Sequence, residues 1–348
     1  MNNSMDVKTL DAAKTATAPV KTKMSEETRG LIYTIVSTVC YTISLSSLRG
    51  ITNYPEVSSD WSIAVKELTT VACVTPLIVV QWLRGKFRFP TWRIVGLIIL
   101  AGVTCQVLGA RYHLASYAAL GLALATPLIQ AAQLLMASVL GVVFLKERGT
   151  KTRALALGLL VVAVWLLSGG ASSLESEIAG KPIRLGAGLL FVILTAFGYS
   201  SELSIMRGYL RGGDASGSTP DDEKASEFAL TSLTMVGITG VGLLICGSIL
   251  TFERGLDAWL SPPPICWAFV LTAGVCNMIG FYFQIESLRR LFVLKQTIVA
   301  NVQTLHLALL GICVYHEAFT WVVALGFVLV LVAVWLAGSE KQNANENE

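Results

Sequence analysis

The sequence predicts an all-α membrane protein whose ten transmembrane helices form two inverted five-helix repeats. The composition is the first reason: 54% of the 348 residues are hydrophobic and only 14% are charged, whereas soluble domains carry about 25% charged residues. The second reason is a succession of apolar runs of about 20 residues, the length that crosses a bilayer as a helix. The third is that polar residues recur at matching positions in the two halves of the chain.

The apolar runs divide the chain into spans, short loops and two polar tails. In chain order, we expect spans at residues 30–50, 62–83, 91–111, 117–145, 152–170, 185–207, 227–251, 264–286, 290–315 and 319–338. The first repeat covers residues 30–170 and the second covers 185–338, and a polar linker at 171–184 joins them. Residues 1–29 contain no apolar stretch, so they predict a disordered cytoplasmic tail and not a signal peptide. Residues 339–348 form a polar C-terminal tail.

The positions of lysine and arginine predict the orientation of these spans. When the N-terminus is placed in the cytoplasm, the cytoplasmic segments hold 20 of these residues and the opposite segments hold 5. The positive-inside rule therefore places both termini in the cytoplasm, which requires an even number of spans. We expect a multi-pass protein of the plasma (cell inner) membrane.

The fourth span contains polar side chains that lipid cannot satisfy. Thr126, Gln130 and Gln133 follow the i, i+4, i+7 spacing of one helix face. Pro127 lacks a backbone N–H and is expected to loosen the same helix. A shift of 171 residues matches this polar face to a second trio in the ninth span, Thr297, Asn301 and Thr304. The two spans are therefore expected to be equivalent elements of a repeat.

Polar matches also join the third span to the eighth and the first span to the sixth. The matched pairs are Gln106 with Asn277 and His113 with Gln284 at an offset of 171, and Ser37 with Thr195, Tyr41 with Tyr199 and Ser44 with Glu202 at an offset of 158. Each half has an odd number of spans, so the second half is inverted relative to the first. Inverted repeats with polar groups near the middle of the membrane are typical of secondary transporters, which hold a solute between the halves.

These matches select the residues that we expect to bind the solute. They are Tyr41, Gln106, Gln130, Gln133, Tyr199, Glu202, Asn277, Asn301 and Thr304. Intramembrane polar groups face a cavity or a partner. Hydrogen bonds between helices are therefore the alternative for the amides and hydroxyls, and the interfacial aromatic belt is the alternative for the tyrosines.

Glu202 makes the two matched faces unequal, because its counterpart is Ser44. An ionised carboxylate inside a span costs at least about 2–3 kcal/mol, so it is expected to be protonated, paired with a cation or hydrated. Competition between a proton and a cationic solute for this carboxylate would couple solute flux to protons. The alternative is a carboxylate that pairs with Arg207 or reaches the cytoplasmic surface.

Two stretches of the chain resemble EamA-type members of the drug/metabolite transporter superfamily. The first is "RYHLASYAALGLALATPLIQAAQLLMASVLGVVFLKERGTKTRALALGLLVVAVWLLSG", and the second is "IVANVQTLHLALLGICVYHEAFTWVVALGFVLVLVAVWLAG". Each contains a polar-faced helix, a helix-ending glutamate and a Gly-containing final helix. The resemblance covers about residues 30–338 and implies the transporter architecture of that superfamily. The glutamates, Glu147 and Glu317, are expected to have structural roles at the membrane surface, with gating as the alternative.

The chain departs from the family pattern at two places. Ile298 stands where the second repeat would carry a proline, and the segment "IESLRRLFVLK" is more charged than its counterpart in the first half. The resemblance also places Lys66 where family members often carry a basic residue, which would favour anionic solutes. Local pairing of Lys66 with Glu67 is the alternative.

Motifs for soluble chemistry are absent from the sequence. It contains no GxxxxGK[ST], HExxH or GxSxG pattern, its seven cysteines form no CxxC pair, and its three histidines show no ligand spacing. We therefore expect no catalytic residue, no metal and no cofactor, and no nucleic acid as a partner.

The predicted function is that of a secondary active transporter, and not of an enzyme. It would move a small polar or amphipathic metabolite by alternating access, with export driven by protons as one version of this function. Its expected partners are the solute, the lipid bilayer and protons as coupling ion. The alternatives are an intramembrane enzyme that acts on a lipid-linked group and a membrane sensor that binds a ligand without transport. Solute identity, direction of flux and oligomeric state are left open.

Overall fold

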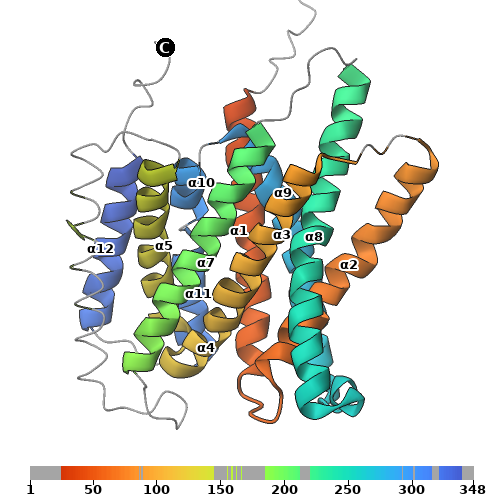
Figure 1. Cartoon of the computed structure of the whole chain (residues 1–348). Helices are drawn as coiled ribbons and strands as arrows, with labels where there is room; N and C mark the ends of the chain where they lie inside the picture. The colour runs from red at the N-terminus through yellow and green to blue at the C-terminus, as the bar shows by residue number, and fades with distance from the viewer. Residues whose placement is uncertain are drawn as a thin grey trace, which may run out of the picture.

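The computed structural model describes residues 25–85, 87, 89–144, 155, 158–159, 162, 166, 185–211, 220–291, 293–300, 302–315 and 321–338. These residues form helices and connecting turns, with no strand among them. The long helices stand side by side and alternate in direction (Figure 1). The start of the first helix and the end of the last helix lie at the same end of the assembly, which we call the termini end.

The first half of the chain forms three long helical stretches and a fourth helix after a sharp turn. In order they are α1 (Glu26–Ile51), α2 (Ser59–Leu83), α3 (Trp92–Val103) with the π-helical turn η2 (Thr104–Ala110) and α4 (Arg111–Leu120), and α5 (Leu122–Phe144). The hydroxyls of Ser25 and Ser58 accept hydrogen bonds from backbone N–H groups in the first turns of α1 and α2. These caps satisfy N–H groups that a helix start leaves unpaired.

The second half of the described chain contains three long helices and three shorter ones. In order they are α7 (Leu185–Arg211), α8 (Pro220–Arg254), the 3₁₀ turn η3 (Leu256–Trp259), α9 (Pro264–Arg290), α10 (Val293–Ala300), α11 (Val302–Cys313) and α12 (Trp321–Gly338). Pro264 begins α9 at the position where its missing N–H costs nothing.

One expected boundary in the first half was wrong. We placed the end of the third span at residue 111, but the helix continues through Arg111 and His113 to Leu120. The chain turns at Gly121, whose φ of 75° lies in the left-handed region that favours glycine. Pro127 does not interrupt α5, which is helical throughout. The irregular backbone lies instead in η2 of the preceding helix.

The described helices have the lengths and surfaces of membrane helices. Six are long and apolar enough to cross a bilayer: Glu26–Ile51, Ser59–Leu83, Trp92–Leu120, Gly186–Leu210, Glu227–Arg254 and Pro264–Arg290. Shorter apolar helices are Leu124–Ala137, Val302–Cys313 and Ala324–Ala333. The expected fifth span and the linker lie largely outside the described residues, as do both tails. The count of ten spans, their inversion and their orientation therefore stay predictions.

Polar and apolar faces are reversed on α1 compared with a helix of a soluble protein. Ile32, Ile35, Val39 and Ile43 form an exposed apolar stripe along it. The opposite face carries buried hydroxyls, among them Ser37 and others one to two turns away. Such a helix fits a lipid surface outside and polar contacts inside.

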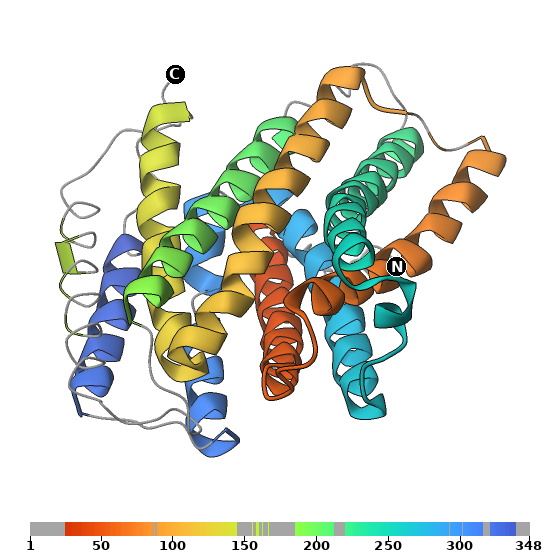
Figure 2. The ribbon, with the colours of Figure 1, turned by 60° about the horizontal axis from the view of Figure 1, so that its bottom comes forward.

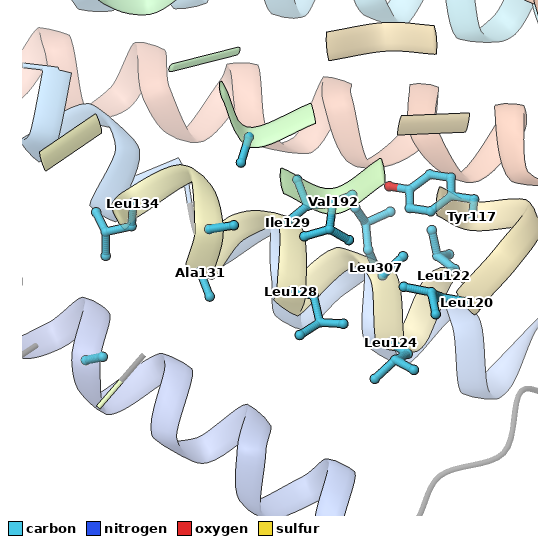
Figure 3. Close-up of a cluster of buried hydrophobic side chains, with 14 residues drawn as sticks. Tyr117, Leu120, Leu122, Leu124, Leu128, Ile129, Ala131, Leu134, Val192 and Leu307 are labelled. Carbon is cyan, nitrogen blue, oxygen red and sulfur yellow. The ribbon is translucent and has the colours of Figure 1, made fainter. Parts of the chain in front are cut away.

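The helices pair across the two halves of the chain. α1 packs along α9, α7 packs along α3, η2 and α4, and α2 packs along α8. Figure 2 shows these neighbours from a second direction. Separate apolar clusters fill the spaces between the pairs, and the largest joins α4 and α5 to α7, α11 and α12 (Figure 3). This arrangement leaves room for polar side chains between the clusters.

Candidate functional site

A cavity lies between the helices of both halves. Its lining comes from α1, α2, η2, α4 and α5 in the first half and from α7, α8, α9, α10 and α11 in the second. It encloses about 1040 Å³ of space, including the part that is open to solvent. The space inside it that water-sized molecules can occupy is about 140 Å³, which is less than the roughly 300–1,000 Å³ that is typical of small-molecule sites.

Seven of the nine residues that we expected to bind the solute line this cavity. They are Tyr41, Gln106, Gln130, Gln133, Tyr199, Glu202 and Asn277. Thr304 is buried but is not part of the lining, and Asn301 lies outside the described residues. The structure thus brings together side chains from five segments of the chain, and their contact with a solute is a proposal.

The two matched tyrosines make the same kind of contact in each half. The Tyr41 hydroxyl donates to Oε1 of Gln284, and the Tyr199 hydroxyl lies 3.1 Å from Nδ1 of His113. Both partners line the cavity, and they are the residues that match at an offset of 171. One hydrogen bond therefore occurs twice, with an amide as partner in one half and an imidazole in the other.

Glycines let each tyrosine lie directly against the neighbouring helix. A Cβ added to Gly109 would lie 2.7 Å from Cε1 of Tyr199. A Cβ added to Gly280, the counterpart of Gly109, would lie 3.5 Å from Cδ1 of Tyr41 and 3.2 Å from Cβ of Cys40. The crossing of η2 with α7 therefore depends more strictly on glycine than the crossing of α9 with α1.

A buried ion pair occupies one wall of the cavity. Nζ of Lys66 lies 2.8 Å from Oε1 of Glu67, and the two side chains are 10% and 1% exposed. Gln106 donates to the same carboxylate oxygen at 3.1 Å. Lys66 therefore pairs locally with Glu67, which was the alternative to a lone cation that attracts anionic solutes.

The π-helical turn η2 positions Gln106 at this wall. A π-helical turn is rare and occurs frequently at functional sites. On the facing helix α8, a Cβ added to Gly242 would lie 2.6 Å from Cδ of Gln106, so the amide lies directly against that helix's backbone. Sequence analysis missed this turn because no residue type marks a π-helix.

Glu202 is buried and lines the cavity from α7. Arg207, the cation expected as its alternative partner, donates to the carbonyl oxygen of Leu288. Among the ion pairs formed between described residues, none includes Glu202. The Glu202 carboxylate has the Cys105 thiol, which also lines the cavity, as a hydrogen-bond partner.

Several polar lining residues were not among the expected site residues. They are Thr34, Ser37, Thr38, Lys66, Glu67, His113, Thr239, Gln284, Gln296 and Gln303. The offset of 171 had already paired His113 with Gln284, and that match was a sufficient signal to include both. Gln296 and Gln303 have no polar counterpart at this offset, because Ala125 and Ala132 stand there.

Comparisons with known proteins agree with the expected family. Residues 66–214 match the family described as "Sugar transport protein", and residues 224–339 match the "EamA-like transporter family". Both families are part of the drug/metabolite transporter superfamily, which confirms the resemblance seen in the sequence. The matches and the six apolar helices support an integral membrane transporter.

The fold is similar to solved structures. One of them, titled "Crystal structure of protein", matches with a TM-score of 0.57 and 15% sequence identity over 88% of this chain and 96% of that chain. At this identity the likeness concerns the fold alone. No curated protein matches the sequence.

Proposed function

We propose that this member of the drug/metabolite transporter superfamily carries a small polar solute across the membrane by alternating access of two inverted five-helix halves. The observation that carries the proposal is the cavity, because helices of both halves contribute to its polar lining. The reciprocal packing of α1 on α9 and of α7 on α3 to α4 supports the inversion, as does the tyrosine contact that occurs in each half.

The lining chemistry favours a solute with several hydrogen-bonding groups. Seven carboxamides line the cavity: Gln106, Gln130, Gln133, Asn277, Gln284, Gln296 and Gln303. A carboxamide both donates and accepts hydrogen bonds, so it can satisfy hydroxyl, amide or amino groups of a ligand. Since one matched family is described as a sugar transport protein, hexoses are the first class of compound to test.

Glu202 is the group through which protons would drive this transport. A carboxylate in a membrane cavity is stabilised by a proton, by a cation or by water. If the proton and the solute alternate at this carboxylate, each leaves the site when the other binds. The flux of solute in one direction then follows the flux of protons in the other.

The first experiment identifies the solute. Purified protein is screened by thermal shift against hexoses, amino acids, nucleosides and organic amines. A ligand at 100 times its Kd stabilises the folded state by about 2.7 kcal/mol, which a melting curve resolves. Binding of no compound from any of these classes would contradict a small-metabolite site.

The second experiment tests coupling in proteoliposomes with an imposed pH gradient. We expect Glu202→Gln to retain solute exchange without a gradient and to lose gradient-driven accumulation. Glu253→Gln is the matched control, because Glu253 is an exposed carboxylate near the end of α8. Unchanged gradient-driven accumulation by Glu202→Gln would rule out the coupling role.

The same preparations separate the alternatives. An intramembrane enzyme would turn over a lipid head group, which extraction and analysis of the proteoliposome lipids would reveal. A sensor would show binding in the thermal-shift screen without flux. Flux with unchanged lipids supports the transporter.

A further inference from the structure

A cluster of ion pairs lies at the termini end, where α9 ends. Glu286 is at its centre: Nη1 of Arg290 lies 2.8 Å from Oε2 of Glu286, and Nε of Arg289 lies 3.8 Å from Oε1. The side chains of these three residues are 8–14% exposed, so they are largely shielded from water. The charged segment "IESLRRLFVLK", which departs from the family pattern, supplies this cluster.

Two ion pairs connect α9 and α10 to the start of α1. Nε of Arg290 lies 2.9 Å from Oε2 of Glu26, and Lys295 on α10 pairs with Glu27. The Arg290 guanidinium also lies 5.1 Å from the ring centre of Tyr33. The first turns of α1 are thus fixed to the end of α9 and to α10.

A third set of contacts reaches α8. Nη1 of Arg289 lies 3.6 Å from Oε2 of Glu227, and Nη2 of Arg289 donates to the Thr231 hydroxyl at 2.8 Å. Thr231 in turn donates to Glu286 at 3.0 Å. We call the whole set the ionic latch: Glu26, Glu27, Glu227, Glu286, Arg289, Arg290 and Lys295.

The ionic latch lies directly beyond one end of the cavity. Thr34, Gln284 and Gln296 line the cavity and are one or two residues away from Tyr33, Glu286 and Lys295. At the same level the Thr34 hydroxyl lies 2.6 Å from that of Ser287. A Cβ added to Gly30 would lie 2.8 Å from Cγ of Leu291. α1 and α9 therefore meet tightly between the cavity and the termini end.

At the matched, described positions of the first half, alanines stand in place of the latch residues on α9. At the offset of 171, Ala115, Ala118 and Ala119 stand in place of Glu286, Arg289 and Arg290. The α4–α5 turn is at the opposite end of the assembly (Figure 1), and its side chains enter an apolar cluster with Tyr117, Leu120 and Leu122 (Figure 3). The opposite end has one ion pair of its own, between Arg111 and Asp60 at 3.3 Å, but around the α4–α5 turn its packing is apolar. The end of α9 is therefore held mainly by ion pairs, and the α4–α5 turn is held mainly by apolar contacts.

We propose that the ionic latch is the gate that closes the cavity at the termini end, while apolar packing around the α4–α5 turn closes the opposite end. This inference rests on the proposed transport function. Three ion pairs of the latch have an exposed partner, Glu26, Glu27 or Glu227, so salt screens them, whereas opening an apolar cluster exposes hydrocarbon to water. Opening at the termini end thus depends more strongly on ionic strength than opening at the other end.

The test measures the accessibility of Cys105, a native thiol that lines the cavity. A membrane-impermeant thiol reagent is applied to oriented vesicles from the termini side or from the opposite side, and modification of Cys105 is read by peptide mass spectrometry. The variants are Glu286→Gln and Glu27→Gln. Glu253→Gln, which removes an exposed carboxylate outside the latch, is the control.

We expect Glu286→Gln to raise the labelling rate from the termini side on the order of fivefold, and Glu27→Gln about twofold, as loss of pairs of this kind predicts. Glu253→Gln should label at the wild-type rate. Raising salt from about 0.1 to 1 M, which shortens the Debye length from about 10 to 3 Å, should accelerate labelling of the wild-type protein more from that side than from the other.

Wild-type labelling rates in the latch variants, or an equal rise from both sides, would overturn the proposal. Glu27 lies in an exposed pair at the surface, so its variant decides the question if Glu286→Gln does not fold. Labelling needs no solute and no flux. If the latch variants label at the wild-type rate, the transport proposal is unaffected. If the flux assay shows no transport, the accessibility result is unaffected.

Discussion

Replacement of Gly198 by alanine tests how closely α7 and the π-helical turn η2 cross. An added Cβ would lie 2.4 Å from the backbone N of Gly109 and 2.7 Å from the carbonyl oxygen of Thr104. Both are backbone atoms of η2, so they cannot rotate away and the helices would have to separate. Extra atoms forced into a packed interior typically cost about 1–3 kcal/mol, and we expect a value in the upper part of this range.

Gly208 supplies the matched control on the same helix, because an added Cβ there meets nothing within 4 Å. Replacing glycine by alanine in a helix raises the helix propensity by about 1 kcal/mol in both variants. The difference between their free energies of unfolding therefore measures the clash alone. We would measure equilibrium unfolding of both proteins in detergent. Gly198→Ala should unfold with a free energy about 1–3 kcal/mol below that of Gly208→Ala. Equal stabilities would refute the close crossing of α7 and η2.

Two further predictions concern the cavity and the orientation. Gln130→Ala and Asn301→Ala should each slow solute flux in proteoliposomes while expression is unchanged, because loss of one buried hydrogen bond costs on the order of 1–3 kcal/mol. Wild-type flux in both variants would show that the solute binds elsewhere. A cysteine at position 341 should react only from the cytoplasm and one at Ser173 only from outside, as the distribution of lysine and arginine requires. External labelling at position 341 would contradict the predicted orientation.

Helical periodicity located most of the cavity, because a membrane helix can place an amide only where a cavity or a partner satisfies it. Tyr41, Gln106 and Tyr199 were found in this way, and each also has a polar match in the other half of the chain. Periodicity could not find the π-helical turn, since the register of a π-helix depends on tertiary packing and not on residue type. It also ended the third span at residue 111, although the helix continues through α4 to Leu120.

The sequence suggested the pairing of Lys66 with Glu67 only as an alternative. Lys66 and Glu67 are adjacent, and adjacent side chains on a helix do not normally face each other. Their ion pair forms because both side chains are buried at the cavity wall and Gln106 donates to the carboxylate from η2. Only the three-dimensional packing supplies that support.

This ion pair determines which charge the cavity favours. A lone Lys66 would attract anionic solutes, but its charge is compensated by Glu67 at 2.8 Å, and two opposite charges this close present little net field to a ligand several ångströms away. Glu202 forms no ion pair with another described residue, so we expect its charge to be the one that a solute in this cavity would meet. If Glu202 contacts the solute as we propose, the cavity should favour neutral and cationic solutes over anions, and cations only while Glu202 is ionised. We then expect protonation of Glu202 to remove that preference, so that a cationic solute and a proton compete for the cavity.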